Sequence, residues 1–384
     1  VLVTDGSHSS PKSVNDGKYM VSVKDFTDYG FDFASCRMIS NDDYETLKRN
    51  GCVPQIDDIL IGKDGARFFE DIIIYRQREK PALLSSIAIL RCDKSKILPD
   101  FLYYVLRTPS FRQDVKDNYG SGSAIPRIIL KDFKRMMVSY PSLEKQQAII
   151  SVLTAIDSKI QANTEINDNL YEIVNAYYTS LFKDVECEMT TIGNYAERIY
   201  SGGTPTTSNA AYWDGTFGWF SSGETRNRFV ISTEKSITQT GIDNSSTKLA
   251  SKHDIVMASA GQGFTRGQTS MLLIDTYVNQ SVIVIHADRN ILPYLFWNLA
   301  NRYEELRAIS DSSSIRGSLT TKMIAAFEIP CANNDVIQTF SGFAWAVIPQ
   351  IENNLLENER LAALRDSLLP KLMTGEIDVS AIQL

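Results

Sequence analysis

Residues 149–181 read IISVLTAIDSKIQANTEINDNLYEIVNAYYTSL, and apolar residues recur in this stretch in alternating steps of four and three. This spacing is typical of a helix whose apolar stripe packs along a second helix. The stripe consists of Ile149, Leu153, Ile156, Ile160, Asn163, Asn167, Leu170, Val174, Tyr177 and Leu181. Only its two central positions are polar. The pattern therefore predicts a long helix whose apolar stripe is interrupted near its midpoint by two asparagines, Asn163 and Asn167.

Residues 340–372, FSGFAWAVIPQIENNLLENERLAALRDSLLPKL, repeat the pattern after a constant shift of 191 residues. The repeated stripe consists of Phe340, Ala344, Val347, Ile351, Asn354, Asn358, Leu361, Arg365, Leu368 and Leu372. An antiparallel pair with pseudo-twofold symmetry would bring the four asparagines together, where they would set the register at some cost in stability. The alternative is that they are exposed amides beside a drifting stripe.

Each helix should be about 38 residues long, which corresponds to ~57 Å at 1.5 Å per residue. If two binding units were held that far apart along DNA, they would address sites separated by more than one helical turn of ~34 Å. Pro349 and Pro370 lie inside the second pattern. Because proline lacks a backbone N–H, we expect them to start, kink or end that helix locally.

The regions before the two helices are also duplicated. Asp58-Ile59-Leu60 matches Asp254-Ile255-Val256, and Ile97-Leu98-Pro99 matches Ile291-Leu292-Pro293, at shifts of 196 and 194 residues. Order and approximate spacing are therefore kept between the copies. Such a duplication suggests that the protein holds two similar units.

Short β-rich runs bounded by Gly, Asp, Asn and Ser fill both regions. The clearest runs are Lys18–Val23, Ile59–Ile61, Ile72–Tyr75, Ile87–Leu90 and Ser281–His286. One amphipathic helix is expected in each copy, from Asp100–Leu106 towards Asp117 and over Pro293–Ile309. We predict an α+β fold, with two similar globular domains separated by two long α-helices forming an antiparallel coiled coil. The predicted boundaries are 1–141, 142–189, 190–332 and 333–384.

Composition excludes several classes of protein. The chain has 384 residues, 43% of them hydrophobic, and no run approaches the ~18 to 20 apolar residues of a membrane span. Its five cysteines are scattered without C-x-x-C spacing, which fits thiols in a reducing cytoplasm. With three histidines and no H-x-x-x-H, no metal site is expected.

The net charge of −7 is unevenly distributed. Residues 142–189 hold 3 basic and 8 acidic side chains, and residues 331–384 hold 3 and 7. Residues 1–141 hold 21 basic and 19 acidic side chains, and residues 190–330 hold 12 of each. The acidity thus belongs to the helices, and the globular parts remain compatible with local basic strips for DNA. Plain solvated charge is an equally good explanation of these numbers.

We find no convincing catalytic motif. The stretch 261–267, GQGFTRG, follows a predicted strand, but its last glycine falls one residue late for a dinucleotide loop and no helix-forming run follows. Asp16-Gly17-Lys18 is one fragment of a nuclease-like set and is better explained as a turn. The sequence contains no Walker loop, no G-x-S-x-G elbow and no amino-methyltransferase motif.

Polar loops instead occur at equivalent places in both copies. They open each copy (5–11 and 201–207), follow a central strand (62–67 and 259–267), and recur at 121–127 and 312–317. Glycine and small hydroxyl residues let backbone N–H groups approach phosphate, and Arg, Gln, His and Lys read base edges. Each loop alone is more simply a structural turn. The duplicated set predicts DNA contacts by Ser7, His8, Lys24, Lys63, Arg67, Ser123, Arg127, Thr204, Ser222, Gln262, Arg266, Ser314 and Arg316.

Four segments together resemble the DNA-specificity subunits of type I restriction–modification systems. Two are domain openings, DGSHSSP with GKYMVSVKD and SGGTPTTSNAAYWDG with GWFSSGE; the others are the helix entry LEKQQAIISVLTAIDSKI and the C-terminal RDSLLPKLMTGEI. The resemblance covers essentially the whole chain. Two features depart from it. The second copy has a leader, 190–200, where the first has only Val1–Thr4, so the first strand is expected to be incomplete, and Asn333-Asn334-Asp335 replaces the Glu-Lys-Gln-Gln of the first helix entry.

The resemblance implies a non-catalytic, cytoplasmic reader with no cofactor of its own. Each target-recognition domain would bind one half of a bipartite, asymmetric target in double-stranded DNA, and the helices would set the spacer. Two methylation subunits, carrying S-adenosylmethionine, would dock on the helices, and restriction subunits would join them. Flipping of the methylated adenine would then belong to the partner. The alternative is a coiled-coil scaffold or DNA-binding adaptor without a restriction–modification role.

Overall fold

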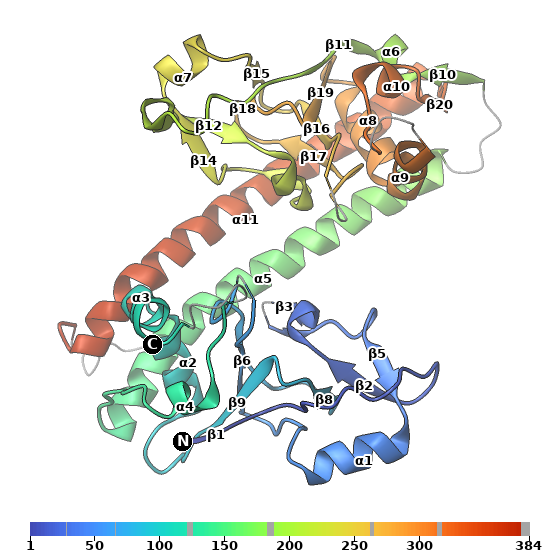
Figure 1. Cartoon of the computed structure of the whole chain (residues 1–384). Coiled ribbons are helices and arrows are strands. Elements are labelled where there is room, and N and C mark those ends of the chain that lie inside the picture. Colours follow the sequence, from blue (N-terminus) through green and yellow to red (C-terminus); the bar gives the residue numbers. More distant parts are fainter. Residues whose placement is uncertain are drawn as a thin grey trace. The chain divides into compact units, whose positions relative to one another are not determined.

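A computed structural model describes residues 1–27, 29–65, 67–120, 126–182, 188–261, 265–312 and 317–377. Contacts divide the chain into two compact units. The first comprises residues 1–159 together with 361–384, and the second comprises residues 160–360. Each unit contains one globular part and a portion of both long helices, α5 (Leu143–Phe182) and α11 (Asn334–Thr374) (Figure 1). The predicted boundaries instead assigned each long helix a region of its own.

The first unit has two main sheets. Its central sheet has the strand order β1-β9-β6-β7, all antiparallel, formed by β1 (Leu2–Asp5), β9 (Ile87–Arg91), β6 (Ile59–Gly62) and β7 (Ile72–Ile74). Its second sheet has the order β5-β2-β8, from β5 (Arg37–Ile39), β2 (Lys18–Val21) and β8 (Ala82–Leu83). A small ribbon joins β3 (Phe26–Thr27) to β4 (Gly30–Phe31).

The second unit repeats this topology. Its central sheet runs β11-β19-β16-β17-β13, from β11 (Ala196–Ser201), β19 (Val282–Ala287), β16 (Ile255–Ala258), β17 (Thr269–Leu272) and β13 (Phe229–Val230). The next runs β14-β12-β18-β15, from β14 (Lys235–Ile237), β12 (Trp213–Phe220), β18 (Thr276–Val278) and β15 (Lys248–Ala250). In both units one parallel pair, β2 with β8 and β12 with β18, interrupts the antiparallel pairing of the second sheet. The leader contributes β10 (Met189–Thr191), which pairs with β20 (Glu328–Pro330).

The duplication extends to a strained turn before each central strand. Asp57 and His253, 196 residues apart, both have positive φ, at 70° and 79°. The following aspartates, Asp58 and Asp254, are both almost fully buried and accept the backbone N–H three residues earlier. Asp58 pairs with Arg91 at 2.7 Å, whereas Asp254 lies 2.6 Å from His286 Nδ1. The same backbone is therefore kept with different partner side chains.

Each unit also contains several shorter helices. The first unit has α1 (Asn41–Arg49), α2 (Pro99–Arg107), α3 (Pro109–Asn118) and α4 (Leu130–Phe133), and the second has α6 (Ile192–Tyr195), α7 (Gln239–Asp243), α8 (Leu292–Ala300), α9 (Tyr303–Ser312) and α10 (Thr321–Ala325). The prediction of one helix over 100–117 was wrong, as was the single helix over 293–309. Thr108 ends α2, and its hydroxyl caps α3, which Pro109 opens.

Both long helices contribute to the two globular cores. In the first unit Ile149 and Leu153 of α5 and Leu372 of α11 pack with Phe101 and the central sheet. The second unit draws on the other halves of the same helices, including Val174 of α5 and Phe340 of α11. Because these residues are buried on folding, each domain is stabilised by both helices.

The helices run antiparallel in each unit. In the first, Arg365 of α11 donates to Asp157 of α5 at 2.7 Å, and the Tyr104 hydroxyl donates to the other oxygen of that carboxylate at 2.7 Å. In the second, Asn163 donates to Asn358 at 2.9 Å, and Asn354 donates to Asn167 at 2.8 Å. The α+β fold with two long, antiparallel paired helices is confirmed. The four asparagines lie against one another, and their role in setting register stays a prediction.

The expected interruption by proline was wrong in one respect. The helix α11 neither starts nor ends at Pro349 or Pro370 but runs through both, from Asn334 to Thr374. An interior proline removes one backbone hydrogen bond and crowds the preceding turn, which costs ~3 kcal/mol. Burial of neighbouring residues such as Ile348, Ile351 and Leu369 offsets this cost.

Replacing Asp157 with alanine should destabilise the first unit by about 2 kcal/mol, because it removes two short bonds and leaves Arg365 with only the neighbouring Asp366. Denaturant unfolding of the full chain, followed by circular dichroism, measures this loss. Asp168→Ala is the matched control on the same helix, since Asp168 pairs with Arg228 at an exposed site and should contribute less than about 1 kcal/mol. Equal losses in the two variants would contradict the assignment.

Candidate DNA interface

The opening loops of the two units begin with a glycine that the fold requires. A Cβ at Gly6 would lie 2.3 Å from the carbonyl oxygen of Leu83, and one at Gly202 would lie 2.0 Å from that of Val278. These distances are far below any van der Waals contact, so a side chain would push the loop off its neighbouring strand. Each loop therefore leaves the first strand of the central sheet along the same path.

The loops after the central strands have the same backbone in both units. Lys63 N–H donates to the Ser86 carbonyl at 2.9 Å, and its own carbonyl accepts from Ile128 at 2.9 Å. Ser259, 196 residues later, does the same with Ser281 and Leu319, at 2.8 Å each. We call this pair of backbone hydrogen bonds the loop frame. It holds Lys63 in the first unit and Ser259 at the equivalent position of the second.

Charged side chains surround this position in the first unit. Lys63 Nζ lies 3.4 Å from an Asp5 carboxylate oxygen, which is 3.3 Å from His8 Nε2. The Lys63 side chain is 9% exposed, whereas that of His8 is 77% exposed. The equivalent residues of the second unit, Ser201, Thr204 and Ser259, are uncharged. Lys63 is therefore a buried, paired charge, and His8 is the group of this cluster that reaches solvent.

Arg127 joins the same cluster through the backbone. Gly65 donates to the Pro126 carbonyl at 2.9 Å, and Asp64 and Arg127 form an isolated antiparallel bridge. The Arg127 side chain is exposed, and a Cβ at Gly65 (φ 97°) would meet nothing within 4 Å. The loop therefore combines an exposed guanidinium with an uncovered backbone, which suits the contact of phosphate or base edges.

The other predicted residues of the first unit have more local roles. Arg67, 73% exposed, is 2.8 Å from Asp71 and 3.5 Å from Glu70. Ser7 is buried, and its hydroxyl bonds to the Ser9 backbone carbonyl and hydroxyl. Lys24 is exposed in the short 3-10 helix Val23–Asp25, and the adjacent Val23 lies near Gly62. Lys24 therefore has no described contact with the cluster, while Ser7 stabilises the backbone of the opening loop.

In the second unit the predicted arginine is mostly buried. Arg266 donates to the Gly317 carbonyl at 2.6 Å and pairs with Asp311, and its side chain is 11% exposed. It thus links Gly317 to Asp311 at the end of α9. Thr204 is hydrogen-bonded to Gln280, and half-buried Ser222 begins a 3-10 helix. Ser123, Gln262, Ser314 and Arg316 lie outside the described residues.

A pair of capping boxes was missed by the sequence reasoning. The Ser22 N–H donates to the Asp25 carboxylate at 2.7 Å, and the Ser221 N–H donates to Glu224 at 2.8 Å. Both acids are buried and hold a short 3-10 helix at the end of the second sheet. The signal was available as S-x-x-D and S-x-x-E, the spacing of a capping box. It marks another loop that is equivalent in the two units.

Three basic side chains of the second unit lie over aromatic rings, and none of them was among the residues predicted from the sequence. Arg198 and Lys248 lie over the Tyr200 ring at 5.8 and 5.7 Å from its centroid, and Lys235 lies 5.7 Å from the ring centroid of Trp213. Burial raises the pKa of Tyr200 to about 12, so it stays a neutral phenol. These basic groups supplement the uncharged loops of this unit.

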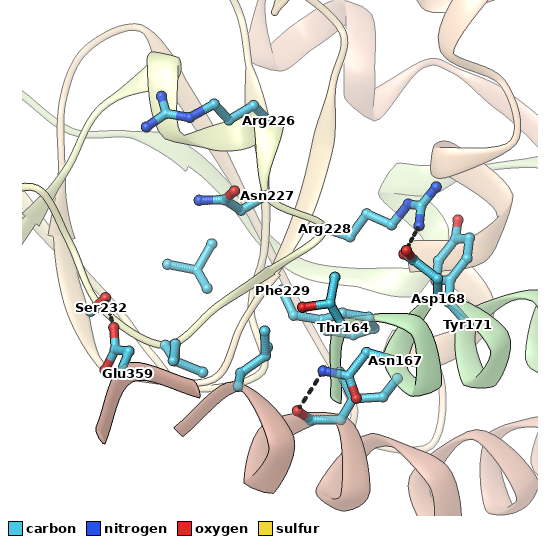
Figure 2. A pocket seen from close by; sticks show the side chains of 14 residues that line it. Thr164, Asn167, Asp168, Tyr171, Arg226, Asn227, Arg228, Phe229, Ser232 and Glu359 are labelled. Carbon is cyan, nitrogen blue, oxygen red and sulfur yellow. Dashed lines mark hydrogen bonds and ion pairs between the residues drawn. The ribbon is translucent and has the colours of Figure 1, made fainter. Parts of the chain in front are cut away.

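A cavity lined by the helix pair in the second unit has a volume of ≈ 480 Å³ and faces the segment 226–232 (Figure 2). Arg228 lies 3.2 Å from Asp168 and 4.3 Å from the ring centroid of Tyr171, both on α5. Glu359 of α11 accepts from Ser232 on the opposite side. Polar and apolar side chains therefore alternate around an open recess.

None of the described helices is long and apolar enough to cross a membrane. Among the described residues, no group of three or more His, Cys, Asp and Glu side chains could hold a metal ion.

The chain is similar to known proteins over most of its length. The sequence profile of the type I restriction modification DNA specificity domain matches twice, at residues 13–172 and 185–336. The HindI specificity subunit of Haemophilus influenzae is 21% identical over 371 residues, covering 75% of this chain and 80% of its own. The EcoR124I/EcoR124II specificity subunit of Escherichia coli is 25% identical over 259 residues, 64% of this chain and 62% of its own.

A solved structure shares the fold. The S subunit of a type I restriction–modification system from M. genitalium matches with a TM-score of 0.50 and 16% identity, over 93% of this chain and 92% of that one. The two matches to the domain profile cover both globular units and much of the helices. The chain therefore belongs to the family of type I restriction–modification DNA specificity subunits and carries two copies of its characteristic domain.

Proposed function

We propose that the chain reads a bipartite, asymmetric DNA target, with one half-site for each unit and the paired helices setting the unspecified spacer. The observation that carries the proposal is the shared loop frame. Lys63 and Ser259 occupy the same backbone position, yet the surrounding set is Asp5, His8 and Lys63 in one unit and hydroxyl residues in the other. Equal frames with different side chains are suited to two different half-sites.

We further propose that the chain is not catalytic by itself and needs no cofactor of its own. In this proposal two methylation subunits, which would carry S-adenosylmethionine and methylate adenine at N6, dock on the helices, and restriction subunits join that core in the cytoplasm. The recess between the helix pair and residues 226–232 supports docking at this place, because its mixed polar and apolar lining is typical of an assembly surface. The relatives are named as subunits of restriction enzymes.

The second candidate is a coiled-coil scaffold or DNA-binding adaptor without a restriction–modification role. The long helix pair alone would serve either function. DNA binding by the complex with its methylation subunits, measured by fluorescence at several salt concentrations, separates them. A reader should bind a specific duplex tightly with a steep loss on raising salt, whereas a scaffold should bind no duplex specifically.

Replacing Arg127 with alanine should weaken binding to the cognate duplex by about 1–3 kcal/mol, because an exposed guanidinium at the loop cluster would lose its phosphate or base contact. The sequence requirement should relax at one half-site only. Methylation-site sequencing or binding to half-site variants measures this. Arg49→Ala, on an exposed helix of the same unit, is the control and should change neither.

Equal relaxation at both half-sites would rule out the assignment of Arg127 to one reader. Unchanged binding by Arg127→Ala would exclude this residue from the interface. Replacement of His8, the exposed side chain of the same cluster, would then test whether the cluster contacts DNA.

Removing two paired helical turns should shorten the permitted spacer. The segments 161–167 and 354–360 lie opposite one another, since Asn163 contacts Asn358 and Asn167 contacts Asn354. Deleting both removes ~10 Å of helix at 1.5 Å per residue, about three base pairs at ~3.4 Å each. Duplexes with graded spacers measure the preferred length.

Deleting only 161–167 is the control for that experiment. It shifts one helix by two turns against the other and should impair folding, because buried residues of both cores would be misplaced. A double deletion that folds and retains the original spacer would exclude the ruler role of the helices.

A further inference from the structure

A second cavity lies in the first unit, away from the loop cluster. It is lined by α2 (Tyr104, Arg107), the start and first turn of α3 (Pro109, Arg112) and α11 (Arg365, Asp366, Leu369), and its volume is ≈ 230 Å³. Three guanidinium groups from three helices thus line one small space. Such a density of positive charge is costly unless something neutralises it, because like charges at short distance repel one another.

One of the three arginines is already neutralised. Arg365 donates to Asp157 at 2.7 Å and to Asp366 at 2.9 Å, so two carboxylates hold it. Its role is to join α11 to α5 in this unit. It supplies one wall of the cavity and leaves little free charge.

The other two arginines have no carboxylate partner within 4 Å among the described residues. Arg107 lies 4.9 Å from the ring centroid of Tyr103 and donates to that hydroxyl. Arg112 donates to the backbone carbonyl of Glu70 at 3.2 Å, and its Nε is buried with no hydrogen-bond partner in the described part of the chain. Two positive groups with unused donors therefore border the cavity, and a buried unused donor carries an energetic penalty.

The electrostatic environment of Arg112 agrees with its lack of a carboxylate partner. Burial and the positive charge of Arg107 lower the pKa of Arg112 from its ordinary value. A guanidinium stays protonated under all ordinary conditions, so the lowering reports a charge held in unfavourable surroundings. A bound anion would bring a negative charge that offsets both effects.

The duplicated unit shows that the fold does not need these charges. The shift of 194 residues that relates the first residue of α3 to that of α9 places Asn301 and Leu306 at the positions of Arg107 and Arg112. The shift of 191 between the long helices places Val174 at the position of Arg365. Asn301 bonds to Asn175, the counterpart of Asp366, at 2.7 Å. The same corner is thus built from uncharged residues in the second unit.

We propose that this arginine cavity is a binding site for a small phosphate-class oxyanion, either inorganic phosphate or a phosphate monoester. Arginine presents planar, paired donors that match phosphate oxygens, and free donors from both α2 and α3 suit an anion with acceptors on several sides better than a two-oxygen carboxylate. The site lies outside the predicted DNA-reading loops and is independent of them. Occupancy would tie α2 and α3 to α11 and stabilise this unit.

The test is calorimetric titration of the full chain with sodium phosphate, with sodium chloride adjusted to hold ionic strength constant. We expect saturable binding that is at least tenfold weaker in Arg112→Gln and in Arg107→Asn, which introduces the residue that the second unit has at this position. Arg49→Gln, an exposed arginine of the same unit outside the cavity, is the matched control and should bind like the unchanged chain. Glycerol phosphate in a parallel titration identifies a monoester if it binds more tightly than phosphate.

Circular dichroism establishes that each variant is folded, and Arg107→Asn keeps the test valid if Arg112→Gln does not fold. Equal phosphate binding in all four proteins, or no saturable binding, would overturn the proposal. It would also be overturned if phosphate displaced DNA at constant ionic strength and Arg112→Gln reduced the salt dependence of DNA binding, because the cavity would then belong to the DNA interface. The two proposals fail separately. If the unchanged chain binds phosphate but its complex shows no specific DNA recognition, the proposed DNA-reading function is wrong and the phosphate site stands.

Discussion

The packing of α5 against α11 is the interaction on which the rest of the structure depends. The first half of α5 and the last part of α11 complete one globular core, and their other halves complete the second. Each domain therefore buries apolar surface from segments far apart in the chain, such as Leu153 and Leu372 in one unit and Val174 and Phe340 in the other. A slip of one helix would remove apolar side chains from both cores at once, and each buried methylene is worth ~0.8 kcal/mol.

The polar contacts within the pair add discrimination to this packing. Apolar side chains at successive turns are similar in size and would tolerate several alignments, whereas an amide must find a hydrogen-bond partner when it is buried. The side-chain N–H groups of Asn163 and Asn354 donate to Asn358 and Asn167, and Asp157 accepts from Arg365. A shift by one turn would leave these groups unsatisfied, at about 1–3 kcal/mol for each. The predicted role of the asparagines in setting the register rests on this cost.

The repeated pattern made the architecture predictable, because periodicity and duplication depend on backbone geometry that is nearly independent of context. The positions of short breaks were not predictable in the same way. Thr108 and Pro109 split a helix that hydropathy alone suggests is continuous, and the prolines of α11 do not interrupt it. Local propensity and tertiary burial differ by only a few kcal/mol at such points, so either can prevail.

The candidate site was predictable as a set of loops and less so as a set of side chains. Sequence spacing located the frame shared by Lys63 and Ser259, but it could not show that Lys63 is held by Asp5 or that Arg266 is held by Asp311. Those pairings depend on strands and helices that are distant in sequence. The search for motifs also passed over Arg107 and Arg112, which gain meaning only when folding brings α2, α3 and α11 together.

The two units illustrate how a duplicated fold can acquire different chemistry at little structural cost. In the loop frame the hydrogen bonds that matter for folding are made by backbone groups, so a lysine and a serine serve equally well there. In the corner beside the helix pair, arginines in one unit replace Asn301, Leu306 and Val174 of the other.

A buried charge, in contrast to an uncharged side chain, must be paired or it destabilises the fold. Asp5 provides the pairing for Lys63, and Asp157 with Asp366 provides it for Arg365. No described carboxylate does so for Arg107 or Arg112, and the proposed anion would supply that missing negative charge.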